Sequence, residues 1–330
     1  MSSEPAMKKE NKAKRISTEM MPYVYFEGDF RPQETATLSF SSHTVQYGTT
    51  VFDSLRDHYI DGNIHIFRLQ EHFERLMESA KILGFEFEME YDKYFKVVTG
   101  LIAKNKPTED VYFRPFIYCD EQVLAPRFDG LKMDLAIYMM PLGAYHGNND
   151  GLKLMISSWK KFSDASISVK AKAGGAYLNA SLARTEAARN GCDEALMMDD
   201  NWNIVEGSVE NIGISYKGEF LVPQEGSAIL GGITIRSVIE LLEAEGIPCR
   251  QTTISRSMVY TADELLLTGT AANVVFAASV DSRNIGPNKR KGPGPLCELL
   301  QNKFQEILHL KHPFHSKWVT VIELNNIEKA

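Results

Sequence analysis

The hydrophobic pattern of the first 140 residues predicts strands joined by tight turns. Short runs rich in β-branched and aromatic residues, which are typical of strands, occupy residues 23–26, 110–118 and 131–140. The runs HYI and IHIF flank Asp61-Gly62-Asn63, and an Asp-Gly pair is typical of a β-hairpin turn. We therefore expect an early hairpin and further strands in this part of the chain.

Two segments of the same region predict helices. Residues 68–83 repeat apolar positions at helical spacing, and Gly84 supplies a helix stop. The apolar face consists of Phe73, Leu76, Met77, Ala80 and Leu83. A second helix is expected over about residues 91–104.

A break in the pattern divides the chain. Residues 141–151, PLGAYHGNNDG, are rich in turn-forming residues, so we place an interdomain linker at residues 141–150. It separates an N-terminal domain at 19–140 from a C-terminal domain at 151–330, and the polar residues 1–18 are expected to form a flexible tail. In the second domain we expect strands at 152–159, 194–198, 203–206, 211–215, 220–222 and 265–267, and helices at 234–245 and 294–309.

Residues 169–191, VKAKAGGAYLNASLARTEAARNG, combine a lysine, a glycine pair and a helix. Leu178 and Leu182 lie four residues apart among alanines, and Asn190-Gly191 supplies the helix stop. Lys172 is therefore expected on a strand or loop that leads into the helix, where the glycines let another backbone or a ligand come close. A lysine in such a place can act as a nucleophile if burial or a neighbouring cation lowers its pKa, although most lysines are solvated.

Three further segments carry groups that suit a cofactor with an anionic end. Glu206 and Glu210 flank a small turn. Gly232-Ile233-Thr234 opens a helix whose first N–H groups and positive dipole end can bind an anion, although simple capping by Thr234 would also explain it. Small residues at 268–272 expose backbone N–H groups that can hold a carboxylate or a phosphate. With the lysine and Tyr177, these are the parts that a pyridoxal phosphate (PLP) enzyme needs.

Four motifs occur in the order, and with the spacing, of the signature series of a known family. They are residues 172–178 (KAGGAYL), 205–211 (VEGSVEN), 232–234 (GIT) and 268–272 (TGTAA). The series resembles that of the class IV aminotransferases, the fold type IV PLP enzymes, and is most similar to the branched-chain amino acid aminotransferases. The resemblance extends from about residue 23 to about residue 308.

The resemblance implies a fold and an assembly. The fold is α+β, a two-domain fold type IV PLP enzyme (D-amino acid aminotransferase-like), with a small N-terminal α/β domain and a larger C-terminal pseudobarrel domain. The cofactor would lie in the cleft between them. The assembly would be a homodimer, or a multiple of dimers, in which the partner subunit helps to close each site.

The resemblance also implies a reaction and its residues. A PLP-dependent transaminase would move an amino group between a branched-chain L-amino acid (Leu, Ile or Val) and 2-oxoglutarate, in a ping-pong cycle through a Schiff base on Lys172. The implied cofactor-binding residues are Arg75, Lys172, Tyr177, Glu206, Ile233, Thr234 and Thr270. The implied substrate-binding residues are Tyr47, Phe52, Arg56, Tyr112, Arg114, Thr270 and Ala271.

Within this set the resemblance gives several residues specific roles. Glu206 would pair with the pyridine nitrogen, with Glu210 as a weaker alternative. Tyr177 would hydrogen-bond the ring hydroxyl oxygen. Arg75 ends the pattern RLxEHxxRL and would bind the phosphate, which suits the planar fork of a guanidinium.

Other interpretations of these residues stay open at this point. Tyr47 and Arg56 could be a half-buried aromatic residue and a surface charge. Arg75 lies off the apolar face of its helix and could be an exposed arginine that pairs with Glu71, four residues earlier. Arg114 interrupts an apolar strand, where it could pair with a carboxylate of the protein, bind a substrate carboxylate, or form a wall of the site.

Departures from the family pattern bear on the substrate. Ala176 stands where the family usually has asparagine, and residues 52–56 read FDSLR in place of the usual FEGIR. Ser54 thus adds a side chain where glycine leaves room, which could narrow the pocket. The segment at residues 121–130 is also shorter than the corresponding loop of the branched-chain enzymes usually is.

Two kinds of alternative function remain. The same fold serves D-amino acid aminotransferases, R-selective amine transaminases and aminodeoxychorismate lyases, but their lysine motif usually lacks the Gly-Gly-x-Tyr found here. A non-catalytic ligand-binding homologue is the alternative from another class, and the presence of both Lys172 and Glu206 argues against it.

Composition narrows the remaining classes. The formal net charge of −7 disfavours a nucleic-acid partner, and the absence of a run of about 18 apolar residues disfavours a membrane span. The N-terminus has no secretory pattern, and the four scattered cysteines lack metal or redox spacing, so we expect a cytoplasmic enzyme that acts on small amino acids and 2-oxo acids. His309, His312 and His315 are evenly spaced, but Pro313 interrupts a helix there and no metal site is predicted.

Overall fold

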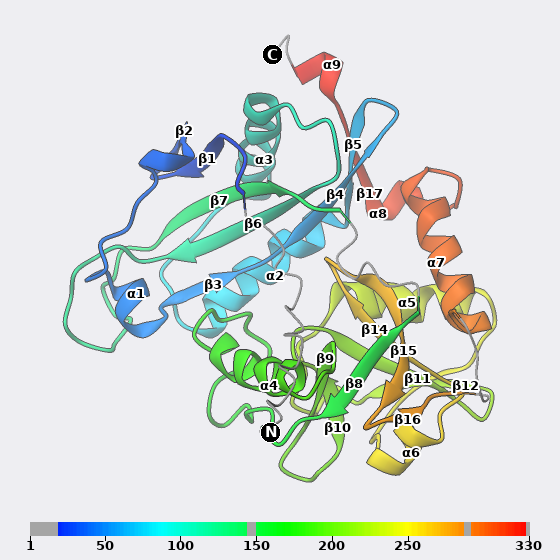
Figure 1. Cartoon of the computed structure of the whole chain (residues 1–330). Helices are drawn as coiled ribbons and strands as arrows, with labels where there is room; N and C mark the ends of the chain where they lie inside the picture. The colour runs from blue at the N-terminus through cyan, green and yellow to red at the C-terminus, as the bar shows by residue number, and fades with distance from the viewer. Residues whose placement is uncertain (1–18, 144–149, 287–291, 328–330) are drawn as a thin grey trace, which may run out of the picture.

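The computed structural model describes residues 19–143, 150–286 and 292–327. The expected tail at residues 1–18 and most of the expected linker at 141–150 lie outside the described residues. Within them the strands form two sheets, one in the upper and one in the lower half of Figure 1.

The first sheet contains the early hairpin and has the strand order β17-β5-β4-β6-β7-β1-β2, with β3 paired to β6. Its strands are β1 (Tyr23–Phe26), β2 (Asp29–Pro32), β3 (Thr50–Phe52), β4 (Leu55–Ile60), β5 (Asn63–Phe67), β6 (Val111–Tyr118), β7 (Asp134–Pro141) and β17 (Val319–Glu323). The hairpin of β4 and β5 turns at Asp61 and Gly62, both with positive φ. The hairpin and the three strands expected from the hydrophobic pattern are confirmed.

The last strand of the chain belongs to this first sheet. β17 lies in the sequence range expected for the C-terminal domain, yet it pairs antiparallel with β5, so the chain end returns to the N-terminal sheet. Pairing between β17 and β5 thus ties the C-terminal segment to the sheet of the N-terminal domain.

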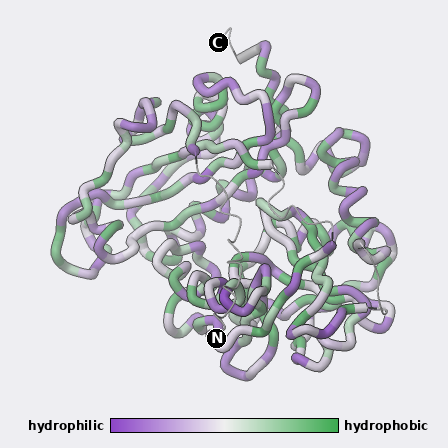
Figure 2. The backbone as a smooth tube through the Cα atoms, in the orientation of Figure 1, coloured by the Kyte–Doolittle hydropathy of each residue, from purple (hydrophilic) through white to green (hydrophobic). Residues whose placement is uncertain are grey.

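Helices α2 (Leu69–Ile82) and α3 (Tyr91–Asn105) cover the first sheet, as the helical spacing predicted. Their apolar faces and the sheet enclose one core, which contains Leu76, Val98, Leu101, Phe113 and Ile117. In Figure 2 the hydrophobic stretches of the tube follow these facing elements. The short helix α1 (His43–Tyr47), which the pattern did not indicate, begins after Ser42, whose Oγ accepts from the Val45 amide.

The second sheet curls into a barrel-like form. Its order is β10-β9-β8-β15-β14-β11-β12-β13, and β10 also pairs with β11, which closes the ring from β10 round to β11. Its strands are β8 (Leu152–Ile156), β9 (Glu194–Met198), β10 (Ile204–Gly207), β11 (Asn211–Tyr216), β12 (Glu219–Pro223), β13 (Cys249–Thr252), β14 (Glu264–Gly269), β15 (Asn273–Val280) and β16 (Arg283–Asn284). The α+β fold with a C-terminal pseudobarrel is therefore confirmed.

Further helices lie around this sheet in Figure 1. They are α4 (Tyr177–Arg189), α5 (Ile233–Ala244), α6 (Arg256–Tyr260) and α7 (Pro295–Leu308). The last two helices, α8 (His315–Trp318) and α9 (Leu324–Ile327), flank β17, and α9 contacts α3, which covers the first sheet. Among the described residues, no helix combines the length and the apolar character that a membrane span requires. All four cysteines are free, and no group of three or more His, Cys, Asp or Glu residues in the described part of the chain is arranged to hold a metal ion.

Helix α4 faces its sheet with alanines rather than leucines. Ala183 and Ala187 pack on Met197 of β9, whereas Leu178 is 71% exposed and Leu182 also faces outward. The leucine spacing that predicted the helix therefore does not mark its buried face. Small side chains are buried because α4 lies close against β9.

The lysine segment is joined to the first sheet by backbone hydrogen bonds. The Phe52 amide donates to the Lys172 carbonyl at 3.0 Å, and the Gly174 amide donates to the Thr50 carbonyl at 2.8 Å. A β-carbon at Gly174 would collide with Thr50 Cγ2. The glycine pair therefore allows a close approach between β3 and the lysine segment, and so between the two sheets.

Replacing Gly174 with alanine should lower stability by about 1–3 kcal/mol, because the new methyl group overpacks this contact. Urea unfolding measures the effect. Gly226→Ala is the matched control, since nothing lies within 4 Å of a β-carbon there. Equal midpoints for the two variants would contradict the role assigned to Gly174.

Asp57 of β4 is a buried carboxyl group without a hydrogen-bond partner in the described structure. Burial, together with the negative charge of Asp110, raises its pKa well above the usual value. A carboxyl group whose folded pKa is raised makes the fold less stable as pH rises above its unfolded pKa of about 3.9.

The variant Asp57→Asn should therefore be more stable than the unchanged protein at pH 8, by at least about 1 kcal/mol. The difference should shrink towards pH 4, where the unfolded carboxyl group also takes up its proton. Urea unfolding at the two pH values tests this. A stability difference that does not depend on pH would be inconsistent with a buried, strained carboxyl group.

Candidate active site

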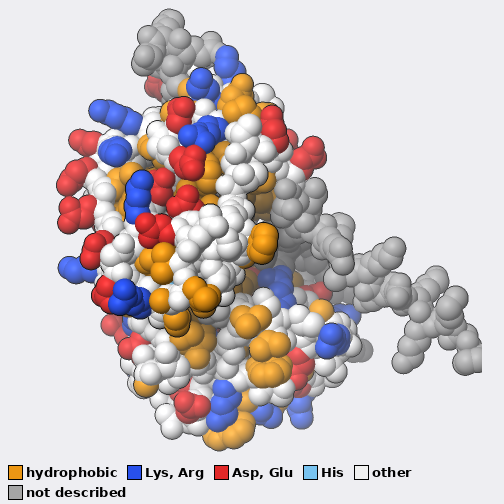
Figure 3. Space-filling view, turned by 90° about the vertical axis from the view of Figure 1, so that its left-hand side faces the viewer, with side chains coloured by type: hydrophobic (Ala, Val, Ile, Leu, Met, Phe, Trp, Pro, Cys, Tyr) orange, Lys and Arg blue, Asp and Glu red, His pale blue; other side chains and the backbone are white. Residues whose placement is uncertain are grey.

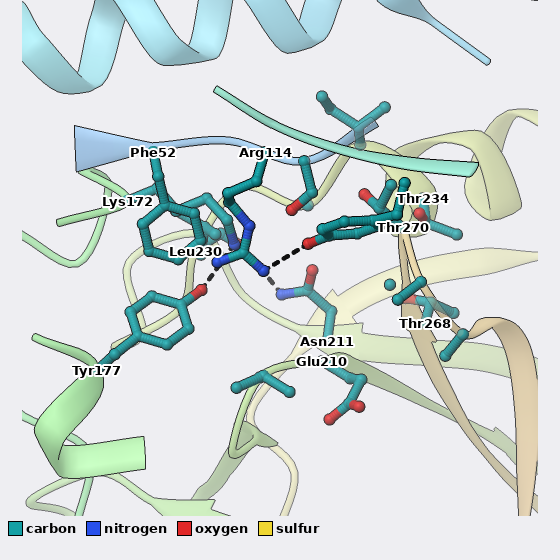
Figure 4. Close-up of a pocket in the computed structure, with 18 of the residues that line it drawn as sticks. Phe52, Arg114, Lys172, Tyr177, Glu210, Asn211, Leu230, Thr234, Thr268 and Thr270 are labelled. Carbon is teal, nitrogen blue, oxygen red and sulfur yellow. Dashed lines mark hydrogen bonds between the residues drawn. The ribbon is translucent and has the colours of Figure 1, made fainter. Parts of the chain in front are cut away.

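A cavity of about 350 Å³ lies between the two sheets. One wall comes from β3, β6 and β7, and the other from α5 and the ends of β11 and β14. In Figure 4, Lys172 and Tyr177 lie at one side of this cavity and Thr234, Thr268 and Thr270 at the other.

Lys172 is buried at the wall of the cavity, two residues before Gly174. Its Nζ donates to Tyr177 Oη at 2.7 Å and lies 5.1 Å from the centre of the Phe52 ring. Burial, reinforced by the positive charge of Arg75, lowers the pKa of Lys172 to about 8. A substantial fraction of neutral amine is therefore present near neutral pH, which a nucleophile or proton acceptor requires.

Tyr177 is the direct partner of this amine and begins α4. Burial raises the pKa of Tyr177 to about 12, so its phenol stays protonated near neutral pH. Its ring also packs on Phe52 at 4.7 Å between centroids, which fixes the hydroxyl group beside the lysine.

One end of the cavity is suited to an anion. Arg75 of α2 is buried there, and Ile233 and Thr234 open α5 at the same end. The N-cap of α5 is Gly232, and no side chain caps the helix, so simple capping by Thr234 does not occur. Helix N–H groups, a guanidinium and the Thr268 hydroxyl, which has no partner among the described residues, are groups that can bind an anion such as a phosphate.

Arg75 is held in place by a buried carboxylate. Its Nε and Nη2 donate to Asp53 at 2.8 and 2.7 Å, and its Nη1 donates to the Gly231 carbonyl at 3.3 Å. His72 also contacts Asp53, at 2.8 Å. The exposed pair with Glu71 that local spacing allowed does not form, since Glu71 pairs with Arg68 instead.

The acidic side of the site has two carboxylates at different depths. Glu210 lines the main cavity, whereas Glu206 lines a small adjoining cavity of about 40 Å³ that also touches Lys172 and Tyr177. The Leu230 amide donates to Glu206 Oε2 at 3.2 Å. A third carboxyl group, Glu194 of β9, is also buried. Burial, together with the charge of Glu210, raises the pKa of Glu194 to about 7.

Arg114 projects into the cavity from β6. Its Nη2 donates to Tyr112 Oη at 2.6 Å, and its guanidinium lies 4.4 Å from the Phe52 ring centre. Within the described part of the chain no carboxylate forms an ion pair with Arg114. The alternative of a protein carboxylate as the partner of Arg114 is therefore excluded for the described residues.

Comparison with known proteins identifies the family. The model of the family "Amino-transferase class IV" matches residues 50–280. The chain belongs to the class IV aminotransferases. The resemblance seen in the four sequence motifs is thus confirmed.

Individual relatives of this aminotransferase place it among the branched-chain enzymes. A probable branched-chain-amino-acid aminotransferase of Aquifex aeolicus (strain VF5) is 34% identical over 305 residues, which cover 92% of this chain and 97% of the relative. The branched-chain aminotransferase of Thermoproteus uzoniensis, solved with norvaline, has a TM-score of 0.87 and 32% identity, covering 92% of this chain and 99% of that one.

A third relative has been solved with several ligands. The T.th. branched-chain amino acid aminotransferase with pyridoxamine 5'-phosphate has a TM-score of 0.85 and 32% identity, covering 91% of this chain and 98% of that one. The same enzyme has been solved with 4-methylvaleric acid and with N-(5'-phosphopyridoxyl)-L-glutamate.

The site of this aminotransferase fits PLP, the cofactor of its family. PLP carries an aldehyde, a ring with a hydroxyl group and a nitrogen, and a phosphate. The buried amine of Lys172 suits the aldehyde, and Arg75 with the uncapped start of α5 suits the phosphate. The orphaned Thr268 hydroxyl in the same cavity is a polar atom that such a ligand would satisfy.

Two of the substrate-binding candidates lie outside the cavity of this aminotransferase. Tyr47, on α1, is 38% exposed and contacts the His43 ring instead. Arg56 binds backbone carbonyls, with Nη1 on Ala271 and Nη2 3.3 Å from Gly143. The other candidates, Phe52, Tyr112, Arg114, Thr270 and Ala271, line the cavity.

Two buried charges of this aminotransferase contact site residues without being indicated by the sequence. Asp53, which departs from the family pattern, binds Arg75. Lys161 pairs with Glu206. Ser54, which stands where the family usually has glycine, lines the cavity, as expected for a residue that narrows the pocket. No local signal indicates Asp53 or Lys161, because their partners lie far away in the sequence.

Proposed function

We propose that this protein moves an amino group between a branched-chain L-amino acid and 2-oxoglutarate. The observation that carries the proposal is one cavity with two kinds of wall. An apolar surface for an aliphatic side chain is formed by Phe52, Met140, Leu142 and Val209. Arg114 offers a guanidinium that pairs with no carboxylate among the described residues. The T.th. relative binds both an aliphatic acid and a glutamate derivative, which supports the same pair of substrates here.

Within this proposal each residue has a task. Bound PLP supplies an aldehyde that condenses with amines and a ring that accepts electron density. Lys172 acts as a base when it takes the proton from the substrate Cα, and as an acid when it gives the proton to C4′ of the cofactor. A pKa of about 8 suits both tasks. Tyr177 orients the lysine and the ring hydroxyl oxygen.

The remaining groups hold and orient. Arg75, Ile233, Thr234 and Thr270 bind the phosphate, and Glu206 keeps the ring nitrogen protonated through a charge-assisted hydrogen bond. The substrate carboxylate lies against the backbone N–H groups of Thr270 and Ala271, a turn that Arg56 positions through the Ala271 carbonyl.

The visible spectrum of the purified protein with PLP tests the reaction class. A yellow band that bleaches with L-leucine supports the proposal. A band that ignores L-leucine but bleaches with D-alanine or a chiral amine moves the substrate to another class IV reaction. A protein that stays colourless with PLP contradicts the assignment of Lys172.

Replacing Arg114 with methionine should separate the two substrates. We expect kcat/KM for 2-oxoglutarate to fall about 10- to 100-fold, since a buried charge-assisted hydrogen bond is lost. The rate of the half-reaction with L-leucine should change by about threefold or less, because its side chain needs no cation. The exposed Arg127→Met is the matched control. Equal losses for both substrates would exclude Arg114 as the dicarboxylate-binding group.

We further propose that the protein forms a homodimer. Large apolar side chains stay exposed at Phe40, Val45, Tyr47, Leu124 and Leu178. Figure 3 shows hydrophobic side chains gathered on the side of the molecule where α1 lies in Figure 1. Exposed apolar patches are typical of interfaces, and Tyr47 would then lie at the subunit boundary. Sedimentation equilibrium should give twice the mass of one chain; a monomer at micromolar concentration would refute the dimer.

We also propose a domain division at the linker, with one domain at residues 19–140 and the other from residue 151. The separate cores of the two sheets support this division. Because β17 pairs with β5 of the first sheet, we assign this C-terminal strand to the small domain.

A further inference from the structure

Lys161 forms a buried ion pair with the carboxylate at the back of the site. Its Nζ contacts Glu206 Oε1, and the exposed fractions of the two side chains are 11% and 6%. The Lys161 amide donates to the Met198 carbonyl at 2.8 Å, so the backbone that carries this lysine is tied to the end of β9. The lysine therefore approaches Glu206 from the side of the second sheet.

The pair leaves the Glu206 carboxylate with a fixed orientation. Lys161 occupies Oε1, and the Leu230 amide donates to Oε2 at 3.2 Å. A carboxylate has about four acceptor positions, so Oε2 can still accept one further hydrogen bond. The small cavity beside this carboxylate is shared with Lys172, Tyr177 and Asn211.

A buried ion pair of this kind is a poor source of stability. Removing two charges from water costs about as much as their attraction returns, so such pairs are often no better than apolar packing. Glu206 and Lys161 line the same small cavity as Lys172 and Tyr177, so the pair has a place in the site rather than in the core.

We propose that Lys161 is a positioning residue, which orients the Glu206 carboxylate and lowers the proton affinity of the bound cofactor, whose ring nitrogen Glu206 would face. The inference rests on the proposed pairing of Glu206 with the ring nitrogen. It assigns to Lys161 the task of setting how strongly the bound cofactor holds its protons.

The direction of the effect follows from charge alone. The positive charge of Lys161 lies behind Glu206 and offsets part of its negative charge. This disfavours a proton on the cofactor, so removal of the lysine charge should raise the pH at which the loaded enzyme loses that proton. At an effective dielectric constant of about 20, the loss of one such charge shifts the midpoint by on the order of one pH unit.

The test is a pH titration of the visible absorption band of the PLP-loaded enzyme. Lys161→Met and Lys161→Gln should each raise the titration midpoint by about one unit, whereas Lys161→Arg should keep it within about 0.3 units. The glutamine variant retains a hydrogen-bond donor without the charge and serves if the methionine variant folds poorly. Glu206→Gln should move the midpoint in the opposite direction, because a negative charge is lost.

The neighbouring lysine supplies a matched control. Lys160 carries the same charge one residue away, but its Nζ lies 3.9 Å from the Trp202 ring centre and 3.8 Å from Asp200, away from the site. Lys160→Met should therefore leave the midpoint unchanged within about 0.3 units. Affinity for PLP, measured by equilibrium dialysis, should fall in the Lys161 variants and not in this control.

The outcomes distinguish a failure of the role proposed for Lys161 from a failure of the proposed pairing between Glu206 and the ring nitrogen. If Glu206→Gln shifts the midpoint while both neutral Lys161 variants leave it unchanged, Lys161 only fills space and the inference is overturned, although the pairing of Glu206 stands. If Glu206→Gln shifts nothing, the pairing fails and the inference fails with it. Shifts of opposite sign for the two residues, with rescue by arginine, support the inference.

Discussion

Replacing Lys172 with alanine should lower kcat by at least about 10⁴-fold, because the proton acceptor and donor of the reaction is removed. The yellow band of the PLP-loaded protein should also disappear, since no other amine of the described structure lines the main cavity. The amine is suited to its task because burial lowers its pKa to about 8. Steady-state turnover of L-leucine and the absorption spectrum measure both effects.

Lys170→Ala is the matched control for this prediction. Its Nζ donates to the Glu225 carbonyl at 3.1 Å on the exposed side of the segment, so turnover should stay within about twofold of the original. Lys172→Arg keeps a positive charge but cannot deprotonate, and it should be as inactive as the alanine variant. Unchanged turnover of L-leucine in Lys172→Ala would rule out the mechanism.

Replacing Asp53 with asparagine should lower the free energy of unfolding at pH 7 by about 3–5 kcal/mol. The substitution keeps the shape of the side chain but leaves the buried Arg75 guanidinium without its counter-charge. PLP affinity should fall as well, because the arginine that faces the phosphate is no longer held in place.

The pH dependence of this loss has a definite sign. Burial opposes ionisation of Asp53, but Arg75 and His72 outweigh it and hold the pKa of Asp53 below its usual value. A carboxyl group with a lowered folded pKa contributes stability that is present above the unfolded pKa of about 3.9 and is lost as pH falls towards the folded value. The difference between the two proteins should therefore be complete at pH 7 and shrink below about pH 4.

Urea unfolding at a fixed protein concentration checks this expectation. Asp200→Asn is the control, since its side chain is exposed and its contact with Lys160 spans 3.8 Å. Its effect should be within about 0.5 kcal/mol. A loss in Asp53→Asn that equals the loss in this control would show that the pair with Arg75 contributes nothing.

Arg75 illustrates where sequence reasoning met its limit. Local spacing placed it off the apolar face of α2, which is typical of an exposed side chain, and only the family pattern pointed to the phosphate. In the structure Arg75 is buried, because the turn between β3 and β4 brings Asp53 against this side of the helix. Burial of an arginine depends on a partner that the helical period cannot reveal.

Leu178 shows what the helical spacing left open. The spacing of Leu178 and Leu182 predicted a helix, and the helix does form, but its alanines are buried and both leucines are exposed. Which face of a helix is buried depends on how closely the neighbouring strand approaches. For α4 that strand is β9, and only small side chains fit.

The sequence by itself determined most of the longer helices and strands and the family, and it singled out Lys172 as the candidate reactive lysine. These are properties of short segments, since periodicity, turn residues and motif spacing can be recognised without knowing what the segments touch. Only the tertiary structure decided that Asp53 holds Arg75, that Lys161 pairs with Glu206, and that Tyr47 and Arg56 lie outside the cavity. Pairing and burial of charges arise from contacts between segments that are distant in the chain, and no local pattern records them.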